Sequence, residues 1–172
     1  KYGAKGGMVG IMDPKTGAII AMSAFPSFDP RNYNEFDYAD FVNPFISSSY
    51  EPGSTFKPLI MAAAIESGVV KPETKCTICA GPVEIGGYKI KTWNDEYQEN
   101  LSMIEVIQHS DNTGMVFVGK KLGKERLFTY LDLYGVGKMT GIDLQGEMVP
   151  QLRARDSWYD IDYATATFGQ GI

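Results

Sequence analysis

The chain of 172 residues lacks several features that would place it in a familiar class of protein. It has one histidine, His109, and two cysteines, Cys76 and Cys79, which are too few ligands for a convincing zinc site. The net charge is -5 and no basic stripe runs along the chain, which argues against nucleic acid as a partner. No apolar run approaches the ~20 residues that span a bilayer, and no secretory signal stands at Lys1.

Internal repeats, low-complexity tracts and clear linkers are also missing from the sequence. The length suits one domain with a substantial core, and 44% apolar with 22% charged residues is ordinary for a globular protein. We therefore expect a single domain over residues 1–172.

The two cysteines form a Cys-x-x-Cys pair, Cys76 and Cys79. A redox motif would stand between a strand and a helix, whereas this pair leads into a hairpin pattern at residues 83–90. We expect a small structural or incidental pair, oxidised if the domain faces an oxidising compartment.

The most informative stretch covers residues 51–58 and reads EPGSTFKP. Pro52 and Gly53 break the preceding segment, and a strongly helical run follows at residues 59–66. Ser54 therefore stands where a helix begins, either as a capping residue or as a nucleophile. Lys57 follows three residues later, on the same face of the helix.

This spacing suits nucleophilic catalysis. A serine hydroxyl needs an adjacent base, and lysine can serve where burial or a nearby cation lowers its pKa. The helix N-terminus adds backbone N–H groups that can stabilise an oxyanion. Taken alone, however, the four residues favour a plainer interpretation, in which Ser54 caps the helix and Lys57 is solvated.

A second motif, Ser110-Asp111-Asn112, follows a short amphipathic run at residues 101–108. Ser-x-x-Lys with Ser-Asp-Asn is typical of penicillin-binding proteins and class A β-lactamases. Further segments read GIDLQGE at residues 141–147 and FGQGI at residues 168–172. In this order, and with the opening at residues 9–28, they resemble the transpeptidase domain of a class B high-molecular-weight penicillin-binding protein.

The resemblance implies an α+β fold of the penicillin-binding-protein and β-lactamase type, with a helical subdomain and a central antiparallel sheet of five strands. Lys15-Thr16-Gly17 spells the family's third motif, but it stands between two apolar runs, so we interpret Lys15 as a hairpin-turn residue. The functional Lys-Thr-Gly of the family lies beyond the segment that corresponds to Ile172. We therefore expect a transpeptidase domain that has only the first two sheet strands and is incomplete at its C-terminus.

The resemblance also implies a mechanism and its partners. Ser54 would attack the D-Ala-D-Ala end of a peptidoglycan stem peptide, Lys57 would accept its proton, Ser110 would relay a proton, and Asn112 would orient Lys57. β-Lactam antibiotics would act as covalent inhibitors. The resemblance implies no cofactor and no metal. It also implies a location at the extracytoplasmic face of the plasma membrane in a bacterial envelope. Other cell-wall synthesis proteins stay open as partners. The alternatives are a β-lactam-hydrolysing enzyme and a non-catalytic penicillin-sensing relative.

The expected secondary structure surrounds these motifs. Ser102 and Glu105 form a capping-box pattern, and the run at residues 59–65 is apolar on every side, which predicts a buried helix. Residues 25–50 are irregular and rich in aromatic side chains, which we expect to attach the loop to the body. We predict hairpins at residues 9–24 and 83–90, helices at 54–67, 102–108, 112–121 and 124–133, and a helix or turn within 156–167.

Overall fold

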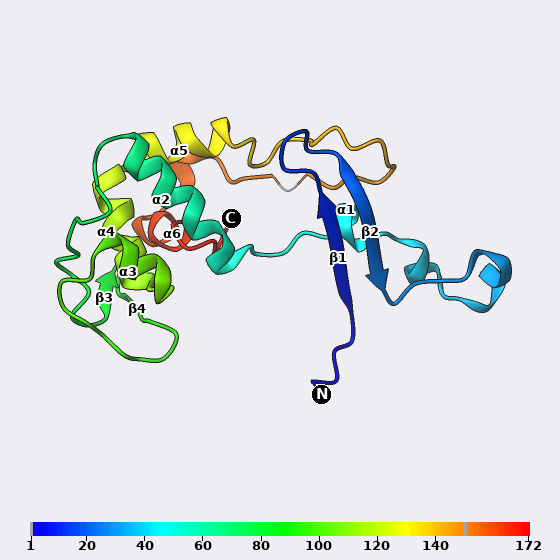
Figure 1. The fold of residues 1–172 in the computed structure, drawn as a ribbon, viewed down its shortest axis with the longest axis horizontal. Coiled ribbons are helices and arrows are strands. Elements are labelled where there is room, and N and C mark those ends of the chain that lie inside the picture. The colour runs from blue at the N-terminus through cyan, green and yellow to red at the C-terminus, as the bar shows by residue number, and fades with distance from the viewer. Residues whose placement is uncertain (1, 150) are drawn as a thin grey trace. The chain divides into compact units, whose positions relative to one another are not determined.

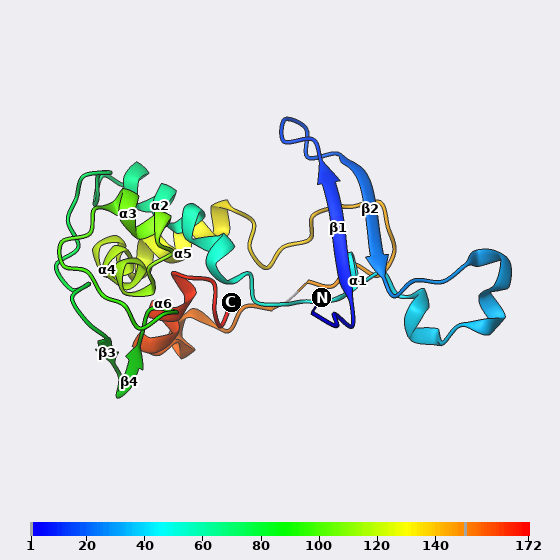
Figure 2. The same ribbon diagram turned by 60° about the horizontal axis from the view of Figure 1, so that its bottom comes forward.

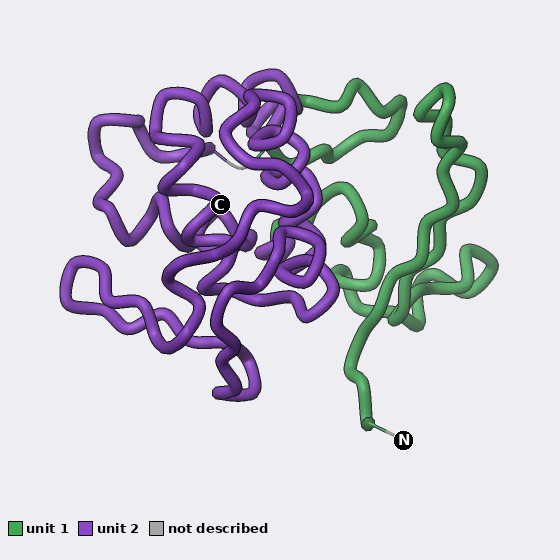
Figure 3. The backbone as a smooth tube through the Cα atoms, turned by 60° about the vertical axis from the view of Figure 1, so that its left-hand side comes forward, with its two compact units in different colours: residues 1–49, 139–150 green, residues 50–138, 151–172 purple. Residues whose placement is uncertain are grey.

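The protein is described by a computed structural model of residues 2–149 and 151–172 (Figure 1). It groups into two compact units, coloured separately in Figure 3. Unit 1 comprises residues 1–49 and 139–150, and unit 2 comprises residues 50–138 and 151–172. Helices with two small antiparallel sheets confirm the α+β class, whereas a single, C-terminally incomplete domain over residues 1–172 stays a prediction.

Unit 1 is built on a β-hairpin of β1 (Gly7–Met12) and β2 (Ile19–Phe25), which run side by side in Figures 1 and 2. The strands are antiparallel, with Gly7 opposite Phe25 and an irregularity in register between Ile11 and Met12. This is the first hairpin that the sequence predicts.

The turn of this hairpin contains Lys15-Thr16-Gly17, as predicted. Asp13 accepts hydrogen bonds from the Lys15 N–H and the Thr16 hydroxyl, each at 2.9 Å, and these bonds lower the pKa of its carboxyl group. Gly17 has φ +75°, which glycine adopts without steric cost. Lys15 itself is exposed, so it is a turn residue.

The aromatic-rich segment of unit 1 contains three short helical turns: η1 (Pro30–Glu35), η2 (Tyr38–Phe41) and α1 (Pro44–Ser47). The Phe28 ring lies edge-on to the ring of Phe41, at 4.8 Å between centroids. The Phe45 ring lies directly over Gly10 of β1. Phe45 thus attaches the segment to the hairpin as predicted, whereas Tyr38 is 83% exposed and its ring lies edge-on to Phe41 within the same segment.

Unit 2 is a helical body with a small hairpin. Helix α2 packs against α3, α4 and α5, while α4 also packs against α5 and α6, an arrangement that Figures 1 and 2 both show. The elements are η3 (Gly53–Phe56), α2 (Lys57–Glu66), β3 (Val83–Ile85), β4 (Tyr88–Ile90), α3 (Met103–Gln108), α4 (Asn112–Leu122), α5 (Lys124–Leu133), η4 (Arg155–Ser157) and α6 (Asp160–Ala166). Each predicted helix and hairpin of this part of the chain is confirmed. No helix of the described residues is long and apolar enough to cross a membrane.

The hydrophobic core is one cluster of residues from unit 2. Helix α2 contributes Ile60 and Ala64, and α4 contributes Met115 and Val118, all with no exposed surface. The prediction that residues 59–65 are buried on every side is wrong, because Leu59 and Ile65 are 40% and 42% exposed. The neighbouring helices cover one side of α2, and the other side remains at the surface.

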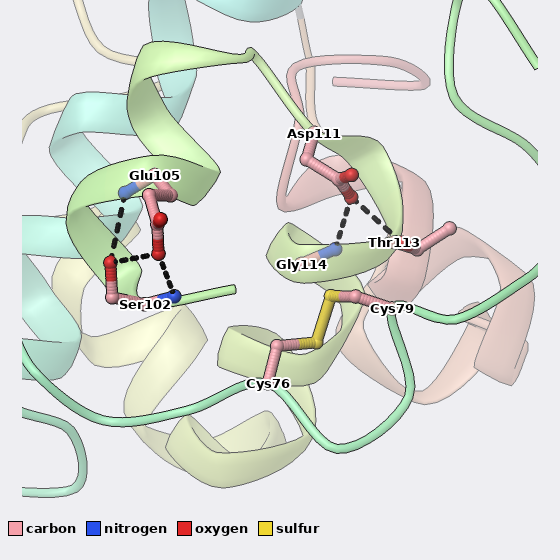
Figure 4. Close-up of a disulfide and its surroundings, with 7 residues drawn as sticks. All are labelled: Cys76, Cys79, Ser102, Glu105, Asp111, Thr113 and Gly114. Carbon is pink, nitrogen blue, oxygen red and sulfur yellow. Dashed lines mark hydrogen bonds between the residues drawn. A yellow bond between two sulfur atoms is a disulfide. The ribbon is translucent and has the colours of Figure 1, made fainter. Parts of the chain in front are cut away.

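The two cysteines are joined by a disulfide, Cys76–Cys79, which lies beside α4 and the start of α3 in Figure 4. Both cysteines are buried, and the Cys76 N–H donates to the Leu101 carbonyl at 2.7 Å. The capping box of Ser102 and Glu105 lies next to it, with the Glu105 carboxylate accepting from the Ser102 N–H at 2.7 Å. The buried disulfide favours the structural alternative of the two that the sequence leaves open.

Candidate active site

Ser54 lies in the 3-10 turn η3, directly before α2. The turn is closed by the Thr55 hydroxyl, which donates to the Pro52 carbonyl at 2.6 Å, and anchored by the buried ring of Phe56. Neither η3 nor α2 has a side-chain cap, so the interpretation of Ser54 as a capping residue is wrong. Ser54 instead exposes its side chain at the start of the helix.

Lys57, the first residue of α2, is the opposite case, because it is only 2% exposed. Its Nζ donates to the Ser110 carbonyl at 2.6 Å, to Asn112 Oδ1 at 2.7 Å and to the Ser110 hydroxyl at 3.0 Å. An ammonium group has three N–H donors, so these partners satisfy a charged lysine completely. The interpretation of Lys57 as a solvated residue is therefore wrong.

Ser110 reaches Lys57 because of how α3 ends. The N–H of Ser110 donates to the Ile107 carbonyl and that of Asp111 to the Val106 carbonyl, at 3.1 and 2.9 Å. These two bonds form a Schellman motif, whose left-handed position is usually glycine. Ser110 occupies that position with φ +54° and directs both its carbonyl and its hydroxyl at Lys57. Such strain in a residue with a side chain is concentrated at functional sites.

Asn112 is fixed by the start of α4. Asp111 is the N-cap, and its Oδ1 accepts from the Gly114 N–H and the Thr113 hydroxyl, both at 2.7 Å (Figure 4). The Asn112 amide nitrogen donates to the Lys91 carbonyl at 2.9 Å. The amide is thereby oriented with its oxygen towards Lys57.

The electrostatics of this cluster suit proton transfer. Burial lowers the pKa of Lys57 to about 8, because desolvation disfavours the charged amine, and the nearby charge of Asp111 opposes this effect. A lysine with a pKa near the working pH can both hold and release a proton. Among the described residues, no group of His, Cys, Asp and Glu side chains could hold a metal ion.

The structure brings together three of the four predicted site residues, Lys57, Ser110 and Asn112. Ser54 lies one turn before Lys57, and the Lys57 backbone N–H donates to the Ser54 carbonyl. In the part of the chain that the structure describes, no hydrogen bond joins the Ser54 hydroxyl to Lys57 Nζ, whose partners are Ser110 and Asn112. Catalytic hydrogen bonds in unliganded sites are often long and tighten when substrate binds. His109 caps the end of α3, is exposed, and is not a partner of Lys57.

Sequence reasoning missed three supports of the site. Asp111 was recognised only as part of a motif, although its position before α4 is a capping signal. The Lys91 carbonyl could not be found, because a backbone group leaves no trace in residue type. The contact between Glu51 and Gly171 joins residues 120 positions apart, a pairing that no local pattern indicates.

An exposed serine precedes a buried, hydrogen-bonded lysine at a helix start in a mixed helix and sheet fold, an arrangement that suits a serine nucleophile with an adjacent base. Residues 7–172 match the family model described as "Penicillin binding protein transpeptidase domain". The chain belongs to this family of penicillin-binding protein transpeptidase domains.

The curated relatives agree with this assignment. Stage V sporulation protein D of Bacillus subtilis is 39% identical over 173 residues, covering 100% of this chain and 27% of the relative. Peptidoglycan D,D-transpeptidase FtsI of Escherichia coli K12 is 31% identical over 98% of this chain and 28% of its own length. The penicillin-binding protein PbpB of Mycolicibacterium smegmatis is 31% identical over 99% of this chain and 26% of its own length. The chain thus spans less than a third of these relatives.

A solved structure shows the same fold. The crystal structure of a peptidoglycan glycosyltransferase from Burkholderia ambifaria matches with a TM-score of 0.83 and 26% sequence identity. The match covers 98% of this chain and 48% of that chain.

Proposed function

We propose that the protein with this chain is a serine-type D,D-transpeptidase that cross-links peptidoglycan stem peptides through an acyl-enzyme on Ser54. The observation that carries the proposal is the buried Lys57, held by Ser110 and Asn112, one turn after an exposed serine at a helix start. The family membership and the relatives named as peptidoglycan D,D-transpeptidases support the same reaction.

Acylation begins with Ser54. Its hydroxyl oxygen attacks the carbonyl carbon of the penultimate D-alanine, and neutral Lys57 accepts the hydroxyl proton. The negative charge of the tetrahedral intermediate is stabilised by the Ser54 N–H at the start of the helix, where backbone N–H groups have no partner within the helix.

Departure of the terminal D-alanine requires a proton on its nitrogen. The Ser110 hydroxyl lies 3.0 Å from Lys57 Nζ, so it can pass the proton from the lysine to the leaving amine. Asn112 keeps Lys57 in place through its oxygen, and its amide nitrogen has a second N–H that can bind the substrate amide.

Cross-linking completes the cycle. An amine of a neighbouring stem peptide attacks the ester carbonyl, the bond to the Ser54 oxygen breaks, and the proton returns to that oxygen through Lys57. A β-lactam would enter in place of the donor peptide and remain on Ser54 as a stable ester. The extracytoplasmic face of a bacterial envelope is the proposed location, and the buried Cys76–Cys79 disulfide supports an oxidising compartment.

Intact-mass measurement after incubation with a penicillin tests the proposal. We expect one adduct on the wild-type protein and none on Ser54→Ala. Release of the adduct as hydrolysed penicillin within seconds would instead indicate a β-lactamase. An adduct on Ser54→Ala would show that Ser54 is not the nucleophile. The same assay on a longer protein that includes the downstream strand tests whether residues 1–172 form an incomplete domain.

A further inference from the structure

The segment after α6, residues 168–172, lies against the residues that lead into Ser54. The Gly53 N–H donates to the Gly169 carbonyl at 2.9 Å. The Glu51 carboxylate, two residues before Gly53, accepts the N–H of Gly171, two residues after Gly169, at 2.7 Å. These two bonds, which we call the Glu51–Gly169 clamp, join the approach to the nucleophile with a segment more than a hundred residues away.

The clamp is also a close packing of backbone on backbone. Gly169 is buried and has φ +76°. A Cβ atom at this position would lie 2.7 Å from the nitrogen and 2.9 Å from the carbonyl carbon of Gly53, and it would also collide with the Gly53 oxygen. Real Cβ atoms do not approach backbone this closely, so any side chain at position 169 must displace Gly53, the neighbour of Ser54.

The same segment is connected to the helix that begins at Asn112. Helix α6 packs against α4, and the Thr167 methyl group fills the space over Gly119 of α4. Thr167 is 1% exposed, and its hydroxyl donates to the Ala164 carbonyl at 2.6 Å. The end of α6 therefore holds the Ser54 turn on one side and the helix of Asn112 on the other.

We propose that Glu51 and Gly169 are positioning residues that fix Ser54 relative to Lys57. Neither contacts the reacting atoms. The clamp holds the backbone that precedes Ser54, whereas Lys57 is held independently by Ser110 and Asn112. Loosening the clamp should therefore misplace the nucleophile and leave the base unchanged. This inference rests on the proposed role of Ser54.

The test for Gly169 uses the full-length protein and a matched glycine. Gly169→Ala is compared with Gly68→Ala, at the end of α2, where φ is +67° and no atom lies within 4 Å of a Cβ. Both variants place alanine in a left-handed backbone, but only the first collides with Gly53. We expect the rate constant of acylation by a fluorescent penicillin to fall about tenfold or more in Gly169→Ala, because sub-ångström errors of placement are costly, and to hold in Gly68→Ala.

The test for Glu51 depends on rescue. Glu51→Ala removes the acceptor of the Gly171 N–H, whereas Glu51→Gln keeps an amide oxygen that can accept it. We expect slower acylation in the first and recovery in the second, with Glu73→Ala as an exposed control. A positioning role lowers the acylation rate constant at saturating penicillin, leaves the non-covalent affinity unchanged, and leaves the pH midpoint of the rate near that of the wild type.

Four outcomes decide the matter. Slower acylation with an unchanged pH midpoint and rescue by Glu51→Gln supports the clamp. Wild-type rates in both Gly169→Ala and Glu51→Ala, in a protein that Ser54→Ala shows to be acylated on Ser54, would overturn it. If the wild-type protein is not acylated on Ser54, the proposed function fails first. The clamp would also be overturned if Gly68→Ala and Gly169→Ala lost rate equally and each only in proportion to its loss of folded protein.

Discussion

The two units of the chain are organised by different forces. None of the described residues of unit 1 is buried, whereas unit 2 contains the whole hydrophobic core. Unit 1 is organised by the backbone hydrogen bonds between β1 and β2 and by the hydrogen bonds of its turn. These interactions without a buried core leave a hairpin only marginally stable. Unit 2 is shaped by packing, and the candidate site lies there because a catalytic group must be held by residues that cannot move.

The treatment of polar groups shows the same difference. In unit 2, buried Lys57 and Asp111 have hydrogen-bond partners. In unit 1, the single atom Oε2 of half-buried Glu147 is shielded from solvent and has no hydrogen-bond partner among the described residues. Satisfied polar networks fix one arrangement of side chains, which is what proton transfer requires.

The largest difference between the units should come from replacing one lysine in each: Lys57 of the Ser-x-x-Lys motif in unit 2, and Lys15 of the Lys-Thr-Gly turn in unit 1. Lys57→Met keeps the length of the side chain but removes the proposed base, so penicillin acylation should slow by about 10³-fold. Lys15→Met changes an exposed turn residue of unit 1 and should leave the rate unchanged. Stopped-flow measurement with a fluorescent penicillin checks both. Equal losses in the two variants would place a site lysine in unit 1 and contradict the assignment.

Two isoleucines test the difference in packing. Ile60 of α2 has no exposed surface, so Ile60→Ala should lower the free energy of unfolding by about 2–5 kcal/mol. Ile11 of β1 is 54% exposed, and Ile11→Ala should cost less than about 1 kcal/mol. Urea denaturation of both variants gives the comparison. A cost at Ile11 as large as that at Ile60 would mean that unit 1 is packed as tightly as unit 2.

Much of the fold could be predicted because the relevant signals are local. The capping box of Ser102 and Glu105 indicates the start of α3, and Gly123 separates α4 from α5. Asp13 and Gly17 form the turn of the first hairpin. Each of these depends on hydrogen bonds within a few residues. The burial of α2 was predicted wrongly, because the covering of Leu59 and Ile65 depends on neighbours that are distant in sequence.

The candidate site, like the fold, was predictable only where its signals are local in the sequence. The spacing of Ser54 and Lys57 indicated a candidate nucleophile and base, but the hydrogen bonds of Lys57 go to Ser110 and Asn112, more than fifty residues away. The sequence alone favoured a solvated lysine. Only the family resemblance linked the two motifs. Three-dimensional packing buries Lys57, and this burial lowers its pKa.

A pH series tests the effect of burial in unit 2. With a pKa of about 8, Lys57 is about one tenth neutral at pH 7 and about nine tenths neutral at pH 9, so acylation should rise about tenfold over this range. Asp111→Asn keeps a capping side chain and removes a charge that raises the pKa, so the midpoint should move to lower pH. A rate that is flat between pH 7 and 9 would exclude Lys57 as the base.

The same pKa shift predicts how stability depends on pH. In the unfolded chain a lysine keeps its ordinary pKa of 10.5, so between pH 8 and 10.5 the unfolded chain binds more protons at Lys57 than the folded protein. The contribution of Lys57 to the free energy of unfolding therefore increases with pH across this window. Comparing urea midpoints of the wild type and Lys57→Met at pH 7.5 and 10 isolates this contribution, which should vanish in the variant.

The smallest expected effect concerns the two left-handed positions that the units treat differently. The hairpin turn of unit 1 uses Gly17 at φ +75°, whereas the site in unit 2 uses Ser110 at φ +54°. The free energy of unfolding of Ser110→Gly should be about 1 kcal/mol higher than that of Ser110→Ala, because glycine adopts the left-handed backbone without the strain that alanine keeps. Both variants should acylate slowly, since both lack the hydroxyl that contacts Lys57.

Gly17→Ala provides the matched change in unit 1. It should lower the free energy of unfolding by about 1 kcal/mol through the same backbone strain, without slowing acylation. If Ser110→Gly instead acylates as fast as the wild type, the hydroxyl has no role and the strain at Ser110 serves only to aim its carbonyl at Lys57. If it acylates slowly, the serine is retained at a glycine position for its chemistry, and a strained backbone marks the site as clearly as the buried lysine does.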